Sequence, residues 1–167
     1  DADEYRGTIG TYPVHLSTYY DSDYAVYIYD AHGIPIPLTT GNVQSERRHV
    51  LYEGVNWSKP KQKVRAKLTF SQKFGQSDEL SGTWENLKTH EQLPIRLSRY
   101  DDSAGSLQSA SFKNAYIRKH CTEQSESKIV QLYQKKTNQL LQTITTDGVC
   151  RGDEVEVGDF NFDGYED

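Results

Sequence analysis

The chain has 167 residues, a formal net charge of −5 at pH 7 and a mean hydropathy of −0.80. Hydrophobic residues make up only 35% of it, and twelve of these are tyrosines. We therefore expect a thin core that tyrosine rings help to fill. No apolar run approaches the roughly 18 residues of a membrane-spanning helix, and the charge gives no basic footprint for nucleic acid.

Methionine is absent and the chain begins Asp-Ala-Asp, so we expect that it was processed or trimmed, as after removal of a signal peptide. The two cysteines are Cys121 and Cys150, and an even pair in a processed chain favours one disulfide in an oxidising compartment. Closing a loop of about 30 residues would stabilise the fold by about 3–4 kcal/mol in the chain-entropy treatment. The alternative is two buried, unpaired thiols. We expect a periplasmic or secreted protein.

Alternating side-chain character, rich in Tyr, Val and Ile, predicts β-strands through most of the first hundred residues. The predicted strands cover residues 11–20, 24–29, 34–38, 48–53, 63–70, 80–85 and 93–100. Pro35 and Pro37 each remove a backbone donor from the third, which predicts either an edge strand or the start of a strand. Helix signals are weak throughout the chain.

Two similar strings, 81 residues apart, organise this first part of the chain. Residues 13–19 and 94–100 share the pattern Pro-(Val/Ile)-(His/Arg)-Leu-Ser-x-Tyr, and a Gly-Thr pair precedes each. We expect the two strands to pair and close a barrel; the alternative is a chance likeness of strand-forming residues. The side chains expected inside this barrel are those of Val14, Leu16, Val26, Ile28, Leu68, Phe70, Ile95 and Leu97.

An acidic stretch rich in Ser and Gly, at residues 101–106, is typical of a linker. It divides the chain into an expected barrel-like accessory domain at 1–105 and a smaller unit at 106–167. The expected fold class is all-β: an antiparallel meander closing into a barrel or sandwich, followed by a small disulfide-stapled β unit. Such a small unit needs its disulfide, an ion or more chain for stability.

Within the smaller unit, strands are predicted at residues 112–120 and in a hairpin. The arms of this hairpin, at 129–133 and 140–144, flank a polar turn at 135–138.

The last nine residues read Asp-Phe-Asn-Phe-Asp-Gly-Tyr-Glu-Asp, which is the spacing of a calcium loop. Oxygen-bearing side chains at alternate positions can converge on one hard cation, and Gly164 supplies the sharp turn. The expected ligands are the side chains of Asp159, Asn161, Asp163 and Asp167 and the backbone carbonyl of Tyr165. Residues 147–167 contain eight acidic residues against Arg151 alone, a charge of −7 that a divalent cation would partly neutralise. The alternative is a solvated acidic turn.

Residues 141–144, Cys150 and residues 155–167 together resemble the periplasmic lysozyme-inhibitor-like proteins. That group includes inhibitors of invertebrate-type lysozyme and immunity proteins against secreted peptidoglycan-cleaving toxins. The resemblance implies a bacterial inhibitor or immunity protein with a calcium-stabilised loop. It also implies a partner that is a lysozyme-like muramidase or a secreted peptidoglycan-degrading toxin.

The sequence departs from that family at the Ser-Gly-x-x-Tyr inhibitory loop. The nearest string, at residues 81–85, reads Ser-Gly-Thr-Trp-Glu and lacks the tyrosine. In the family the inhibitory loop follows the calcium site, so we expect this chain to hold an accessory domain and the start of a truncated inhibitory domain. The partner-binding residues are left unassigned.

Catalytic motifs are absent from the sequence, which has no Gly-x-Ser-x-Gly or His-Glu-x-x-His string. We therefore expect no enzymatic activity. The rival interpretation is a glycan- or surface-binding β module, because exposed aromatic rings stack on sugars. Seven of the twelve tyrosines lie within the first 29 residues, and Trp57 and Trp84 add two large rings. We favour the interpretation in which these rings fill a core poor in Leu and Phe.

Overall fold

The computed structural model describes residues 2–19, 23–40, 43–54, 64–100, 105–121, 127–147, 155 and 157–158. These residues form twelve β-strands and one short 3-10 helix, η1 (Gln44–Glu46), without an α-helix. The expectation of an all-β fold is confirmed. No helix in the described part of the chain is long and apolar enough to cross a membrane.

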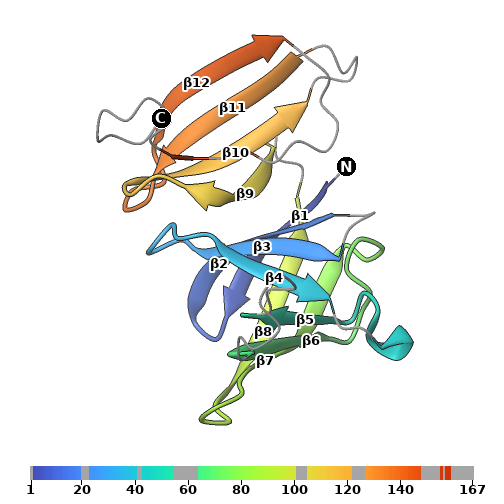
Figure 1. Cartoon of the computed structure of the whole chain (residues 1–167). Helices are drawn as coiled ribbons and strands as arrows, with labels where there is room; N and C mark the ends of the chain where they lie inside the picture. The colour runs from blue at the N-terminus through green and yellow to red at the C-terminus, as the bar shows by residue number, and fades with distance from the viewer. Residues whose placement is uncertain are drawn as a thin grey trace.

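Eight strands form a closed antiparallel barrel, and four more form a separate antiparallel sheet (Figure 1). The barrel strands are β1 (Ala2–Ile9), β2 (Tyr12–Tyr19), β3 (Tyr24–Tyr29), β4 (Ile36–Thr40), β5 (Val50–Glu53), β6 (Ala66–Phe70), β7 (Glu79–Asn86) and β8 (Gln92–Arg99). The sheet strands are β9 (Ser106–Ser111), β10 (Ala115–Cys121), β11 (Ser127–Gln134) and β12 (Leu140–Asp147).

The barrel closes between its first and last strands. Each strand pairs with the next along the chain, and β1 also pairs with β8, with Tyr5 opposite Arg99 and Ile9 opposite Ile95. The prediction that residues 13–19 pair directly with residues 94–100 is wrong, because β1 lies between β2 and β8. Strand β1 was not predicted, since its charged residues obscure the apolar alternation.

The two Gly-Thr pairs have a structural reason. A Cβ atom on Gly7 would lie 2.0 Å from the Arg96 carbonyl oxygen, and one on Gly82 would lie 1.8 Å from the Thr69 carbonyl oxygen. Only glycine fits where two backbones approach so closely. The repeated string therefore marks two hairpins, β1–β2 and β7–β8, that begin and end the barrel.

Fourteen buried side chains form the barrel core: Tyr5, Ile9, Val14, Leu16, Ala25, Tyr27, Leu38, Leu51, Leu68, Phe70, Phe74, Leu80, Ile95 and Leu97. Six of the eight residues expected there are among them. Val26 and Ile28 are buried as well, but on the outer surface of the barrel. Leu16 lies in the barrel core and is opposite Tyr27, so Tyr27 points inward as well. Its two neighbours in the strand, Val26 and Ile28, therefore point outward.

Strand β4 is not an edge strand, since it pairs with β3 on one side and β5 on the other. The alternative prediction of a strand start is correct. Pro35 precedes the strand, and Pro37 is opposite Val26, before the ladder with β5 begins at Leu38. The missing donor of each proline therefore costs no hydrogen bond between β4 and β5.

One end of the barrel is plugged by the connection between β6 and β7. Phe74, only 5% exposed, belongs to the barrel core. The Tyr5 hydroxyl donates to the Ser77 carbonyl at 2.8 Å and accepts a hydrogen bond from the Gly75 amide at 2.8 Å. A buried tyrosine thus satisfies backbone groups of the connection and holds it across the barrel end.

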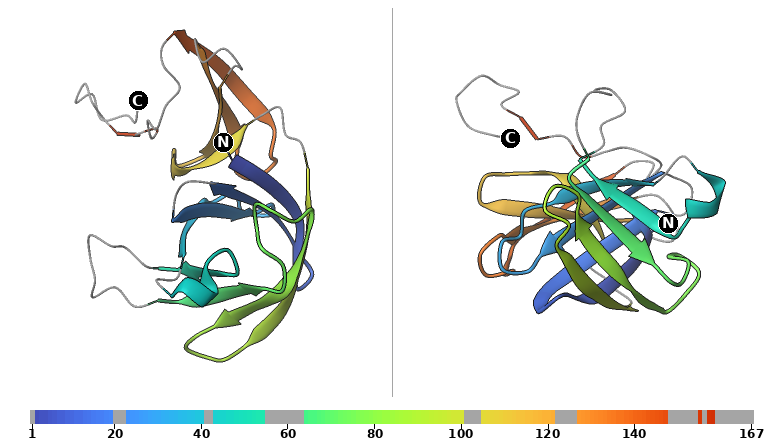
Figure 2. Two further views of the ribbon diagram at one scale, coloured as in Figure 1. Left: turned by 90° about the vertical axis from the view of Figure 1, so that its right-hand side faces the viewer. Right: turned by 90° about the horizontal axis from the view of Figure 1, so that it is seen from below.

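The four-stranded sheet has the order β12-β11-β10-β9 and lies against the outside of the barrel (Figure 2). Strand β9 contacts β1, β2 and β3. In the shared hydrophobic cluster, Val26 and Ile28 pack with Leu107 and Tyr116. The predicted hairpin is present as β11 and β12, whereas β9 was not predicted, because its start lies in the stretch interpreted as a linker.

Candidate functional site

The residues predicted from the sequence to form sites fall mostly outside the described residues. These are Asp159, Asn161, Asp163, Tyr165 and Asp167 of the calcium loop, together with Cys150. Cys121 ends β10. Within the described ranges, no group of three or more His, Cys, Asp or Glu side chains could hold a metal ion. The calcium loop and the disulfide therefore stay predictions.

A buried ion pair joins the sheet to the barrel. The guanidinium of Arg118, on β10, lies 3.4 Å from the Glu4 carboxylate, and their side chains are 4% and 7% exposed. Arg118 also donates to the Gly105 carbonyl at 2.7 Å. Ser17 donates to Glu4 at 2.8 Å and accepts from the Leu107 amide at 3.0 Å. These charge-assisted contacts fix the position of β9 and β10.

A second contact holds the turn between β11 and β12. The Asn138 side-chain amide donates to the Asp30 carbonyl at 3.1 Å, and its oxygen accepts from the Tyr116 hydroxyl at 3.2 Å. Gly33 lies against this turn. Its φ of 60° is a backbone conformation that favours glycine, and a Cβ atom at this position would lie only 2.6 Å from the Lys135 carbonyl oxygen. Only the turn end of the hairpin is therefore anchored here.

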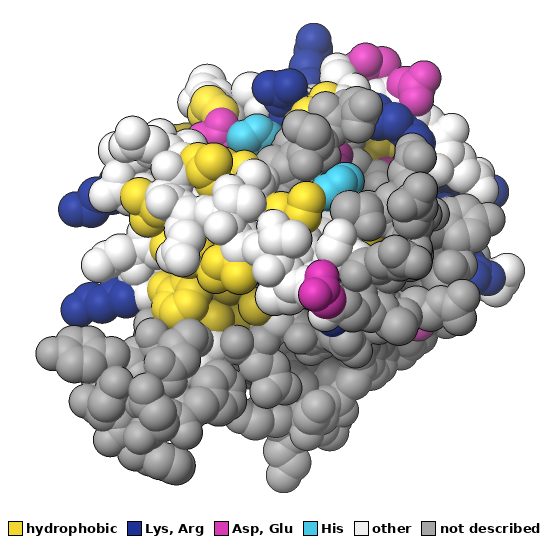
Figure 3. Space-filling view, turned by 90° about the horizontal axis from the view of Figure 1, so that it is seen from above, with side chains coloured by type: hydrophobic (Ala, Val, Ile, Leu, Met, Phe, Trp, Pro, Cys, Tyr) yellow, Lys and Arg dark blue, Asp and Glu magenta, His cyan; other side chains and the backbone are white. Residues whose placement is uncertain are grey.

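The rest of β12 lies open to solvent. All eight of its residues are exposed, including Leu140 at 46%, Leu141 at 55% and Ile144 at 38%. No other strand of the described chain pairs with its outer edge. Figure 3 looks down on this side of the molecule and shows hydrophobic side chains at the surface among polar ones.

The composition of β12 gives it none of the usual protection of an edge strand. Natural edge strands commonly carry lysine, proline or inward-pointing charges that prevent pairing with another chain. Residues 140–147 read Leu-Leu-Gln-Thr-Ile-Thr-Thr-Asp, in which Asp147, the last residue, is the single charge. The exposed amides and carbonyls of this strand can accept a further strand, and its apolar side chains can add specificity. We name residues 140–147 the open edge.

The aromatic residues at the start of the chain are divided between core and surface. Tyr5 and Tyr27 are at most 1% exposed, as the core interpretation predicts. Tyr27 donates to Glu53 at 2.7 Å, and burial raises the pKa of Tyr27 far above its usual range. Tyr12 is 56% exposed, and the buried indole nitrogen of Trp84 has no hydrogen-bond partner among the residues that the structure describes.

Comparison with protein-family models, with curated proteins and with solved structures found no match to this chain. The assignment of function therefore depends on the residues and their geometry. Sequence reasoning found the hairpin but did not identify the open edge. Its signal was the uncharged, β-branched composition of residues 140–146, which is typical of strands that pair with other strands.

Proposed function

We propose that this protein is a secreted or periplasmic binding protein that engages another protein by strand addition at the open edge. The exposure of all eight residues of β12 carries this proposal. An edge strand with a single terminal charge and with exposed leucine and isoleucine is a hazard for a protein without a partner, because it promotes aggregation. A partner that covers it removes this hazard and gains backbone hydrogen bonds.

The partner that we propose is a basic, lysozyme-like peptidoglycan hydrolase, which the bound protein inhibits. The resemblance of residues 141–167 to lysozyme-inhibitor-like proteins supports this class of partner. Charge supports it too, because residues 147–167, which begin in the open edge, carry a charge of −7. An acidic segment that follows the docking strand in the sequence would steer a basic enzyme toward this part of the chain, and added salt would weaken this steering.

We also propose that residues 159–167 bind calcium. Millimolar calcium should raise the melting temperature of the full chain by mass action, because the ion binds only the folded loop. Asp163→Ala removes one predicted ligand and should abolish the increase. A melting temperature that is unchanged by calcium in both proteins would show that the loop is only an acidic turn.

Inhibition of cell-wall lysis by purified basic muramidases tests the main proposal. The unmodified full chain should inhibit at least one of them at near-stoichiometric ratios. The variant Leu141→Lys/Ile144→Lys should lose inhibition, because two charges on the open edge oppose strand addition. The control Ile34→Lys/Val43→Lys changes two other exposed aliphatic residues, 55% and 56% exposed, and should inhibit normally. Equal inhibition by both variants would contradict the proposal.

One observation favours a second candidate function, glycan binding. Tyr12 lies edge-on to Tyr29, with their ring centroids 6.1 Å apart, on the inward-facing side of the strands at one end of the barrel. Aromatic rings suit the face of a sugar ring. Tight binding to a polysaccharide, without inhibition of any muramidase, would favour this function.

A further inference from the structure

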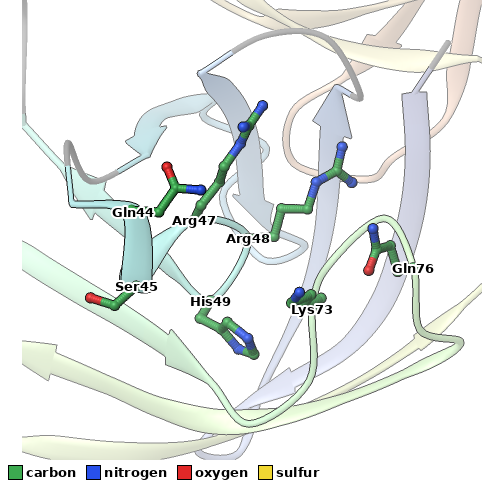
Figure 4. Close-up of a pocket in the computed structure, with 7 residues that line it drawn as sticks. All are labelled: Gln44, Ser45, Arg47, Arg48, His49, Lys73 and Gln76. Carbon is green, nitrogen blue, oxygen red and sulfur yellow. The ribbon is translucent and has the colours of Figure 1, made fainter.

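A pocket of about 490 Å³ lies at the plugged end of the barrel, formed by two neighbouring connections (Figure 4). One is the segment between β4 and β5 that contains η1, and the other joins β6 to β7. Backbone hydrogen bonds hold them together: Phe74 N–H donates to the Arg48 carbonyl at 3.0 Å, and Phe70 N–H donates to the His49 carbonyl at 2.7 Å. These hydrogen bonds join the two walls of the pocket.

The side chains that line this pocket are basic or neutral, and none is acidic. Three are cationic, those of Arg47, Arg48 and Lys73; His49 lies beside them, and Gln44 and Gln76 add amide groups. In a chain with a net charge of −5, this is a local excess of positive charge. We name it the basic pocket. Fields from several like charges around a concave site attract a counter-ion of opposite sign.

Two of the three cations have no ion-pair partner in the described part of the chain. Arg99, in contrast, lies 2.7 Å from the Asp3 carboxylate, and Arg118 lies 3.4 Å from Glu4. The side chains of Arg47 and Lys73 are exposed and take part in no such pair. Their charges are therefore available to a ligand without first breaking an ion pair within the described ranges.

The backbone at Arg48 places two consecutive arginines on one side of the chain. Arg48 has a φ of 64°, a left-handed conformation that costs a residue with a side chain about 1–2 kcal/mol. Figure 4 shows the Arg47 and Arg48 side chains extending in the same direction, whereas Ser45 points away. Such strained residues gather at binding sites, where the surrounding structure maintains them.

His49 adds a directed ring to the basic pocket. Its Nδ1 lies 3.0 Å from the Phe70 carbonyl oxygen, and because a carbonyl only accepts, Nδ1 carries the hydrogen. The other ring nitrogen, Nε2, is then an acceptor in the neutral ring and a donor in the protonated ring. The Arg48 guanidinium is oriented in a similar way by the Phe74 carbonyl at 3.5 Å.

We propose that the basic pocket binds a phosphate group. Guanidinium groups match the oxygen atoms of phosphate in pairs, and lysine binds the same group as a point charge. The pocket volume lies within the range of ligand-binding sites, roughly 300–1,000 Å³, which leaves space for a sugar or another small group that carries the phosphate. This site is separate from the open edge, because barrel residues alone form it.

Titration of the full chain with inorganic phosphate at constant ionic strength, followed by backbone amide chemical shifts, tests this proposal. Saturable shifts should be confined to residues 44–49 and 73–76. Arg47→Gln/Lys73→Gln should weaken binding by about tenfold or more, because two charge-assisted contacts are lost. A parallel titration with glucose 1-phosphate distinguishes free phosphate from a phosphate monoester. Tighter binding of glucose 1-phosphate would indicate that the pocket accommodates a monoester, and tighter binding of inorganic phosphate would indicate that it accommodates the free ion.

The control variant Lys88→Gln/Arg96→Gln removes the same charge from two exposed residues of β8 and the β7–β8 turn. It should change phosphate affinity by less than about twofold, since only long-range charge is altered. Circular dichroism should be the same for both variants. Absence of saturable shifts in the unmodified chain, or equal weakening in the two variants, would overturn the proposal.

Discussion

Tyrosines supplement a mainly aliphatic core, in which Tyr5 and Tyr27 are two of the fourteen buried side chains, and buried tyrosines need hydrogen-bond partners for their hydroxyl groups. Burial raises the pKa of six of them, Tyr5, Tyr19, Tyr27, Tyr29, Tyr52 and Tyr116. The Tyr19 hydroxyl donates to the Leu107 carbonyl at 2.6 Å, across the junction between barrel and sheet. A core built in this way depends on its tyrosines remaining protonated.

The first prediction is therefore a loss of stability in alkali. An unfolded tyrosine has a pKa near 10, so above about pH 10 the unfolded chain releases protons that the folded chain retains. The stabilising contribution is complete below that pH, and the free energy of unfolding should fall as the pH rises above it. Absorbance at the tyrosinate band should show delayed, incomplete ionisation until the protein unfolds. Reversible ionisation of all twelve tyrosines near pH 10 would contradict this.

The second prediction concerns the buried pair of Glu4 and Arg118. Arg118→Met leaves a carboxylate without its cation at the junction and should lower the free energy of unfolding by about 3–5 kcal/mol. Glu4→Gln/Arg118→Met removes both charges and should recover part of this loss. Unfolding in denaturant measures both, with the exposed Arg96→Met as a control expected to stay within about 0.5 kcal/mol. If the effects of Arg118→Met and of Glu4→Gln, each measured alone, add up to that of the double variant, the two charges do not interact.

At the scale of strands, the alternation of side chains predicted the barrel where one face is polar, as in β6 and β8. It failed where both faces are buried: Val26 and Ile28 pack against the sheet, while Tyr27 points into the barrel. It also missed β1 and β9, because polar residues occupy positions that the junction buries, Glu4 in β1 and Gln108 in β9. The basic pocket was missed since its residues come from two connections, and only the run Arg47-Arg48-His49 signals it.

The third prediction tests the close approach of strands at Gly82. Gly82→Ala places a methyl group 1.8 Å from a backbone carbonyl oxygen, a contact that only separation of β6 and β7 can relieve. The free energy of unfolding should fall by about 3 kcal/mol or more, at the upper end of overpacking costs. Thr8→Ala, on the outward side of β1, is the control and should cost no more than about 1 kcal/mol. A neutral Gly82→Ala would refute the observed register.

On the scale of the whole molecule, the barrel acts as a support for the sheet. Its outer surface at β1, β2 and β3 holds β9, and the Glu4–Arg118 pair fixes β10. The remaining strands extend from this anchored half, so that β12 is the farthest from the barrel in the order of the sheet. The open edge is thereby held in a fixed orientation, which lowers the entropic cost of binding a partner strand.

Hydrogen–deuterium exchange of the full chain, free and mixed with an inhibited muramidase, tests the open edge most directly. In the free protein, about half of the β12 amides should exchange rapidly, because in an edge strand alternate N–H groups have no partner. Binding should slow exchange at residues 140–147 and leave the barrel unchanged. Protection confined to the barrel, or exchange in β12 that stays equally fast in the complex, would show that the partner does not bind by strand addition.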